Sequence, residues 1–261
     1  MSRISLTIDV ESDWGGRLQP CRENCIGIEK GIPQLLSMLE RNRAKATFFV
    51  SASIFSLYGE LVKEMMAKGH EIASHGYLHT DYSKLGKADL LYQAKKSKEL
   101  LEDGLNCEIA GFRAPQFRMH PDLYETLFVA GYKYDSSAVC GRLAGRYDNS
   151  KLRKSPFKTN HNILEIPISN IPMTNKPMGI LWINHLGFSI FSALERFSGA
   201  GDVVIYLHPF DILEQKSKND FGLLVNFWYT FKAASACNTL KRIIDYYSRS
   251  SNFVTLNKYL E

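Results

Sequence analysis

The chain has 261 residues, of which 45% are hydrophobic and 23% are charged. This balance excludes an intrinsically disordered chain, and the length suits a single α/β barrel domain spanning residues 1–261. The net charge of +5 is too small to indicate a nucleic-acid partner, and no recognition motif for one is present.

The first half of the chain alternates apolar strands with amphipathic helices. In chain order we expect a strand at residues 4–10, a helix at 28–41, a strand at 46–51, a helix at 57–68, a strand at 70–74 and a helix at 89–105. Gly69 is suited to ending the second of these helices.

The second half continues the alternation. We expect strands at residues 108–113, 132–135, 164–168, 203–207 and 253–256, and helices at 121–130, 189–197 and 223–248. Such alternation predicts a mostly parallel sheet, closed or nearly closed into a barrel. Residues 138–162 lack clear periodicity, and long irregular loops in compact domains are often functional.

The positive charge is concentrated between Arg142 and Lys158. This stretch holds six basic residues against one acid, Asp148, so its net charge of +5 equals that of the whole chain. A solvated loop is one interpretation. The other is contact with an anionic group, such as the phosphate of a lipid-linked or nucleotide-linked sugar.

Five scattered cysteines do not form a disulfide framework, and we expect reduced thiols. The opening residues pass directly into a short strand-like run, which does not resemble a signal peptide. No run of 18 apolar residues is present, so we expect no membrane-spanning helix. We therefore expect the protein in the cytoplasm, or at the inner face of the membrane.

Ionisable side chains gather where the predicted strands end. In parallel barrels, catalytic groups lie at the carboxyl ends of the strands. The polar residues at these ends are Asp9, Glu11, Ser51, His75, Arg113, Asp135 and His208.

His75 and His79 are separated by four positions. On a helical turn this spacing puts both imidazoles on one face, where they can bind one metal ion. By itself the pair is a weak signal, because two unrelated histidines at this spacing are common.

Asp9 and Glu11 end the first predicted strand. Strand alternation directs both side chains to the same side. Two buried carboxylates repel each other unless cations compensate them, and a divalent metal together with an arginine would do so.

Arg113 and His208 follow two further strands. An arginine is permanently charged and can bind a carboxylate through two parallel hydrogen bonds. A histidine can titrate near neutral pH and donate a proton. Together these residue types indicate a hydrolytic site.

Five motifs in this order resemble the polysaccharide deacetylases, the NodB-homology group of carbohydrate esterases. They are Thr7-Ile8-Asp9-Val10-Glu11, Ser74-His75-Gly76-Tyr77-Leu78-His79, Phe112-Arg113-Ala114-Pro115, Tyr134-Asp135-Ser136-Ser137 and Leu207-His208-Pro209. The resemblance implies a distorted (β/α) barrel of about seven parallel strands with one divalent metal ion, zinc being the expected one. It also implies removal of an N-acetyl group from an amino sugar or glycan precursor.

The resemblance further implies roles for single residues. Asp9 would be the general base, Arg113 its partner and His208 the general acid. His75 and His79 would bind the metal. Members of the family often carry two adjacent aspartates, but here Val10 follows Asp9. The carboxylate ligand is therefore expected to be Glu11, with Asp13 as the rival.

Three further assignments are weaker. Asp135 would tune His208, with Asp211 as a possible substitute. Trp182 would form a wall of the pocket that stacks on a sugar, or would belong to the core. The Leu207–Asp211 ending and the aromatic residues 227–229 resemble the branch linked to envelope and exopolysaccharide synthesis.

Two other functions remain open at this level. A related hydrolase on the same scaffold could be a deformylase of a lipid-linked amino sugar, which would fit the basic stretch, or an amidohydrolase of a small ureide. A non-catalytic carbohydrate-binding protein would be favoured if a catalytic residue were missing, and none is.

Overall fold

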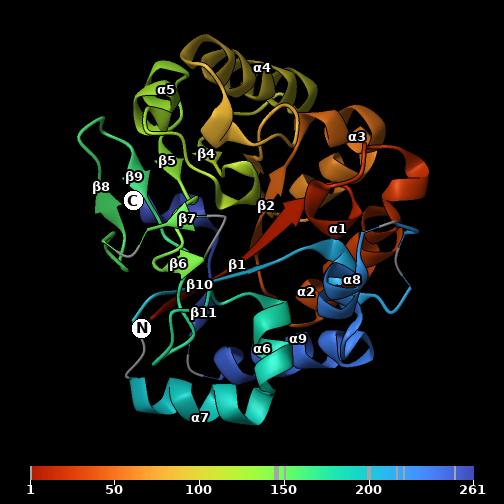
Figure 1. Cartoon of the computed structure of the whole chain (residues 1–261). Helices are drawn as coiled ribbons and strands as arrows, with labels where there is room; N and C mark the ends of the chain where they lie inside the picture. The colour runs from red at the N-terminus through yellow and green to blue at the C-terminus, as the bar shows by residue number, and fades with distance from the viewer. Residues whose placement is uncertain are drawn as a thin grey trace.

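A curled, mostly parallel sheet forms the centre of the protein (Figure 1). The computed structural model describes residues 2–143, 147–149, 151–198, 201–215, 217–219, 221–249 and 251–261. Among these, the strand order is β10-β1-β2-β3-β4-β5-β9-β8, and β11 pairs with β1. The seven strands from β10 to β9 are parallel, and β8 joins β9 in antiparallel fashion. The expected barrel of about seven parallel strands is confirmed.

The strands of the described residues vary from long central ones to two-residue pairs. They are β1 (Arg3–Val10), β2 (Ala46–Val50), β3 (Glu71–Ser74), β4 (Gly111–Phe112), β5 (Tyr134–Asp135), β6 (Arg142–Leu143), β7 (Tyr147–Asp148), β8 (Phe157–Lys158), β9 (Leu164–Glu165), β10 (Val203–Leu207) and β11 (Asn252–Phe253).

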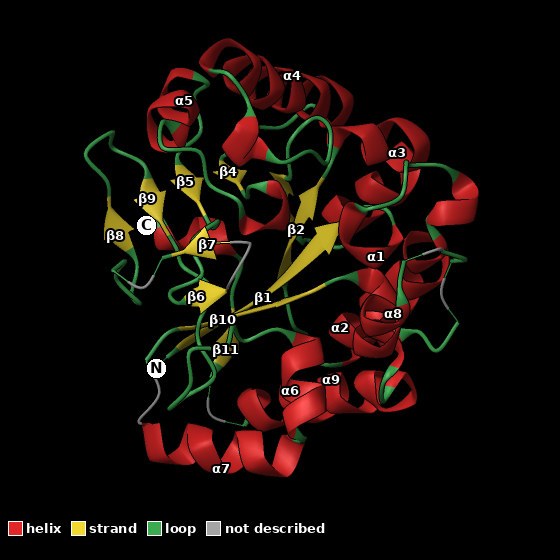
Figure 2. Cartoon of the chain, in the orientation of Figure 1, coloured by secondary structure: helices red, strands yellow, loops and turns green. Residues whose placement is uncertain are grey.

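The helices of the described residues lie around the sheet (Figure 2). They are α1 (Asp13–Gly16), α2 (Ile32–Arg41), α3 (Ala52–Ala67), α4 (Lys87–Leu105), α5 (Leu123–Val129), α6 (Ile180–Leu186), α7 (Phe188–Ser198), α8 (Leu223–Thr230) and α9 (Ala233–Ser248). None of them is both long and apolar enough to cross a bilayer.

Strand β1 illustrates why the sheet positions a polar site. Ile4, Leu6 and Ile8 belong to the larger apolar core. Alternation sends the intervening Thr7 and Asp9 to the opposite face, inside the curled sheet. Both side chains are buried there and contact the Arg113 guanidinium.

The long helix expected at residues 223–248 is wrong as one element. It divides into α8 and α9, because Lys232 adopts a left-handed conformation with a φ of 55°. The Lys232 carbonyl, at the start of α9, accepts hydrogen bonds from the Ser235 backbone N–H and, over 2.9 Å, from the Asn184 side chain. Helix α6, which carries Asn184, was not expected as an element at all.

Candidate active site

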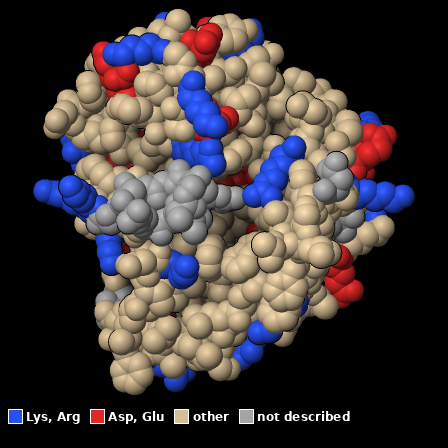
Figure 3. All heavy atoms as spheres, in the orientation of Figure 1, with Lys and Arg blue, Asp and Glu red and all other residues tan. Residues whose placement is uncertain are grey.

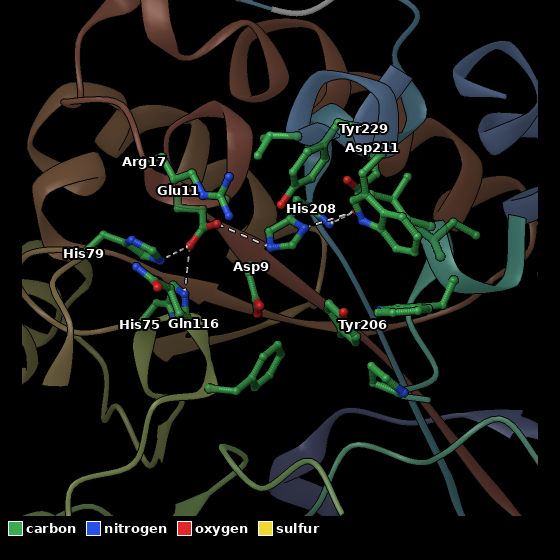
Figure 4. A pocket seen from close by; sticks show the side chains of 18 of the residues that line it. Asp9, Glu11, Arg17, His75, His79, Gln116, Tyr206, His208, Asp211 and Tyr229 are labelled. Carbon is green, nitrogen blue, oxygen red and sulfur yellow. Dashed lines mark hydrogen bonds and ion pairs between the residues drawn. The ribbon is translucent and has the colours of Figure 1, made fainter. Parts of the chain in front are cut away.

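A pocket of about 300 Å³ opens where the carboxyl ends of β1 and β10 meet the segments after β3 and β4. Its lining includes Asp9, Glu11, His75, His79 and His208 (Figure 4). On this side the space-filling surface is hollowed near its centre (Figure 3). Parallel strands bring their carboxyl ends to one edge, so residues far apart in the sequence meet here.

The Asp9 carboxylate is paired with Arg113. Nη1 of Arg113 donates to Asp9 Oδ1 over 2.7 Å, and neither side chain is appreciably exposed. The remaining guanidinium N–H groups donate to Thr7 and Ser136, and the Phe49 ring lies 4.0 Å from the guanidinium carbon. A fully buried cation held this firmly compensates the buried carboxylate of Asp9.

Glu11 converges with the two histidines of the motif. Its Oε2 lies 3.0 Å from His75 Nε2 and 2.6 Å from His79 Nε2. Burial alone would raise the pKa of Glu11, but the charge of His79 and the contacts with both imidazoles lower it well below its usual range. The carboxylate is therefore ionised, as a metal ligand must be.

The donor set fits a metal ion. His75 Nδ1 lies 2.9 Å from the Arg113 carbonyl oxygen, which only accepts, so Nδ1 carries a proton and Nε2 is the ring nitrogen directed at Glu11. A contact of 3.0 Å between this nitrogen and a carboxylate oxygen needs a cation between them, either a proton or a metal ion. His79 Nε2 approaches the same oxygen without hydrogen-bond alignment, and neither ring nitrogen of His79 has a hydrogen-bond partner among the described residues. Within the described part of the chain, the donor atoms of Glu11, His75 and His79 lie close enough together to hold a metal ion.

The histidine pair is not carried by a helix, contrary to the expectation from its spacing. His75 and His79 lie on an irregular loop after β3, and Gly76 between them has a φ of +79°. A Cβ at Gly76 would lie 2.2 Å from the Tyr82 hydroxyl oxygen, so only glycine fits this bend. The bend at Gly76 brings the imidazoles of His75 and His79 together.

His208 lies opposite the histidine pair and contacts Asp211. Its Nδ1 is 3.1 Å from Asp211 Oδ2, which also accepts a hydrogen bond from the His208 backbone N–H over 2.8 Å. Its Nε2 is 3.3 Å from Glu11 Oε1. Burial would lower the pKa of His208, but the charge and hydrogen bond of Asp211, helped by Glu11 and Asp9, raise it to about 9. The imidazole is thereby kept protonated at neutral pH.

Asp211, rather than Asp135, is the carboxylate beside His208. Asp135 instead accepts a hydrogen bond of 2.6 Å from Ser137 Oγ, and burial raises its pKa. Asp13, the rival metal ligand, binds the Gly27 N–H over 2.9 Å and also contacts Ser217. It is not a member of the Glu11 cluster.

Part of the pocket wall is apolar and aromatic. It includes the sequence-predicted Trp182, from α6, and Trp228, from α8, whose ring centroids are 4.5 Å apart. Sequence reasoning missed several lining residues: Arg17, Gln116, Tyr206, Trp228 and Tyr229. Tyr206 could have been found from strand alternation, because it lies two residues before His208. The others depend on loops and on the break between α8 and α9.

The basic stretch from Arg142 to Lys158 contributes no described residue to the pocket lining. Arg146 lies outside the described residues, as do the side chains of residues 142–148. Contact between this stretch and an anionic group stays a prediction.

The chain is similar to proteins whose names concern deacetylation. The family model of polysaccharide deacetylases matches residues 3–134, from β1 to β5. The peptidoglycan deacetylase-like protein FGM2 of Gibberella zeae is 29% identical over 251 residues, covering 79% of this chain and 74% of that protein. The peptidoglycan deacetylase of Helicobacter pylori is 30% identical over 111 residues, covering 42% of this chain and only 38% of that protein.

A solved structure of the PuuE allantoinase superimposes with a TM-score of 0.68 and 15% identity. The superposition covers 98% of this chain and 88% of that one. At this identity the likeness concerns the fold alone.

Proposed function

Because the chain belongs to the polysaccharide deacetylase family, we propose that it is a metal-dependent enzyme that removes the N-acetyl group of an amino sugar or glycan precursor. Membership makes it a hydrolase of carbon–nitrogen bonds other than peptide bonds. One observation carries the proposal: a buried carboxylate–arginine pair, a three-residue donor cluster and a protonated histidine line one pocket.

The chemistry divides among these groups. A divalent cation held by Glu11, His75 and His79, with zinc as the expected ion, would polarise the acyl carbonyl and lower the pKa of a water molecule. Asp9, held by Arg113, accepts the proton of the attacking water. His208, held by Asp211, donates a proton to the departing amine. Acetate and the free amino sugar are the products.

The aromatic wall supports a sugar as the substrate. Trp182 and Trp228 offer apolar ring faces and edges to the pocket, against which the apolar face of a sugar ring can lie. The sugar's acylamino group then points toward Asp9 and His208.

The test is acetate release from an N-acetylated chito-oligosaccharide. Dialysis against a chelator should abolish release, and added Zn²⁺ should restore it. Asp9→Asn should lower kcat by about 100- to 10,000-fold, the usual contribution of a general base. Bound metal should stay unchanged, because Asp9 is not among the donor atoms. Asp103→Asn, on the exposed face of α4, is the matched control.

The same assay separates the alternatives. Formate release from N-formylated sugars without acetate release would favour a deformylase, and turnover of a ureide alone would favour a small-ureide amidohydrolase. Sugar binding without turnover after metal restoration would favour a non-catalytic protein. Near-normal activity of Asp9→Asn would remove Asp9 from the role of base. Phosphate-linked and lipid-linked N-acetyl sugars belong in the same panel.

A further inference from the structure

The loop after Glu11 presents Arg17 to the pocket. Residues 12–18 fold back on themselves: the Gly16 N–H donates to the Ser12 carbonyl over 2.9 Å, and Ser12 Oγ donates to the Leu18 carbonyl over 2.5 Å. Arg17 lies between these two contacts, so its backbone position is fixed on both sides. Its side chain is exposed yet lines the pocket (Figure 4).

Two glycines set this loop directly against the donor cluster. Gly15 and Gly16 have φ values of +73° and +66°, which favour glycine. A Cβ at Gly16 would lie 2.2 Å from His79 Nδ1. A Cβ at Gly15 would lie 3.1 Å from the Tyr229 hydroxyl oxygen and 3.8 Å from Glu11 Oε1. Arg17 is therefore held at a fixed place beside the reacting centre.

The other charges of the pocket already have partners. Asp9 binds Arg113, Asp211 binds His208, and Glu11 meets the histidine pair. Arg17 forms no ion pair within the part of the chain that the structure describes, and its guanidinium lies 5.7 Å from the Phe221 ring centroid. It is also the one lysine or arginine among the described lining residues. A lining cation without a protein partner is suited to binding an anion from a ligand.

We propose that Arg17 binds an anionic group, a carboxylate or a phosphate, carried by the acylated sugar itself. The inference rests on the proposed function and narrows its substrate to acidic N-acyl amino sugars. Planar guanidinium groups bind both oxyanions in bidentate fashion. Trp182, Trp228 and Arg17 line the same pocket, so a sugar held there has aromatic and cationic side chains within reach.

Three probes test this: a neutral chitobiose with two N-acetyl groups, N-acetylmuramic acid with its carboxylate, and N-acetylglucosamine 1-phosphate. In the wild-type enzyme, kcat/KM should be higher for at least one acidic probe than for the neutral one. Arg17→Gln should reduce that acidic-to-neutral ratio about tenfold, and Arg17→Lys should restore part of it. Arg196→Gln, an equally charged change on an exposed position of α7, should leave all three values unchanged. The probe that responds identifies the source of the charge.

Two results would overturn the inference. An unchanged ratio in Arg17→Gln would show that Arg17 does not meet the substrate's charge. An equal loss on all three probes would place Arg17 at the reacting acyl group, whose charge is common to all of them. If no probe is turned over after metal restoration, the proposed function fails. Equilibrium binding of the acidic probes to wild type and Arg17→Gln then still decides the inference, with about tenfold weaker binding expected for the variant.

Discussion

At the residue scale, Asp9 and Glu11 are two carboxylates with different surroundings. Asp9 meets a permanently charged guanidinium, whereas Glu11 meets imidazole nitrogens. The residue types indicated that a metal ion and an arginine would compensate the two acids, and the resemblance to the family implied which acid meets which. The spacing of the residues could not show whether Asp135 or Asp211 lies beside His208. That choice depends on the turn after β10, in which Asp211 reaches back to His208.

Asp211 is expected to set the pH range of activity. The proposed general acid, His208, can donate a proton only while protonated, so activity should fall as pH rises through its pKa. Asp211→Asn removes a raising influence on that pKa, so the basic limb of kcat/KM should move to lower pH. The rate at neutral pH should fall by at least about tenfold. pH–rate profiles of wild type and variant provide the measurement.

Asp135→Asn is the matched comparison, because Asp135 bonds to Ser137 instead. The basic limb of its kcat/KM profile should stay at the wild-type pH. A shift in Asp135→Asn with none in Asp211→Asn would reverse the assignment.

At the element scale, the regular helices and long strands were predictable and the bends were not. Apolar periodicity located β1, β2, α4 and β10 to within a few residues. The loop of His75 and His79 was misjudged, since a spacing of four suggests a helical turn while Gly76 imposes a bend. The Gly15–Gly16 turn similarly escaped notice, because its packing against His79 is a tertiary contact.

Gly16→Ala should weaken metal binding. The new Cβ would lie 2.2 to 2.4 Å from the imidazole of His79 and force that ring to move. Displacing a ligand ring typically weakens metal affinity by about 10- to 100-fold. Competition with a chromophoric zinc chelator measures the change, and circular dichroism verifies the fold.

Gly187→Ala provides the control. Gly187 also has a positive φ, of +92°, but a Cβ at this position would meet no atom of the described residues within 4 Å. The backbone strain of about 1 kcal/mol is then present without the clash. Equal zinc affinity in Gly16→Ala and Gly187→Ala would refute a role for the Gly15–Gly16 turn in positioning His79.

At the scale of the whole molecule, the curled sheet buries acids that take no part in the pocket. Asp135 on β5 and Glu165 on β9 are paired in register and fully buried. Burial and the neighbouring charge of Asp135 raise the pKa of Glu165 well above its usual range, which favours its protonated form. The sequence predicted both strands but not their neighbouring acids, because strand order is not visible in one sequence.

This pair should make stability depend on pH. Folded Glu165 keeps its proton above pH 4.5, where the unfolded carboxyl loses it, so the free energy of unfolding should fall as pH rises. One linked proton accounts for at most about 1.4 kcal/mol per pH unit. Glu165→Gln mimics the protonated acid and should flatten this dependence in denaturant titrations between pH 4.5 and 8.

Glu125→Gln, at an exposed position of α5, changes the charge equally and should keep the wild-type slope. Identical slopes in all three proteins would mean that Glu165 is ionised in the folded state.

Strand β1 has a consequence for how the chain folds as it is synthesised. It is synthesised nearly two hundred residues before its neighbour β10. Glu11, His75 and His79 can assemble as soon as β3 is in place, whereas His208 arrives with β10. In a nascent chain the Glu11, His75 and His79 side chains are therefore all present before His208 is made, while an apolar edge of β1 stays unpaired. Such an edge is prone to aggregation.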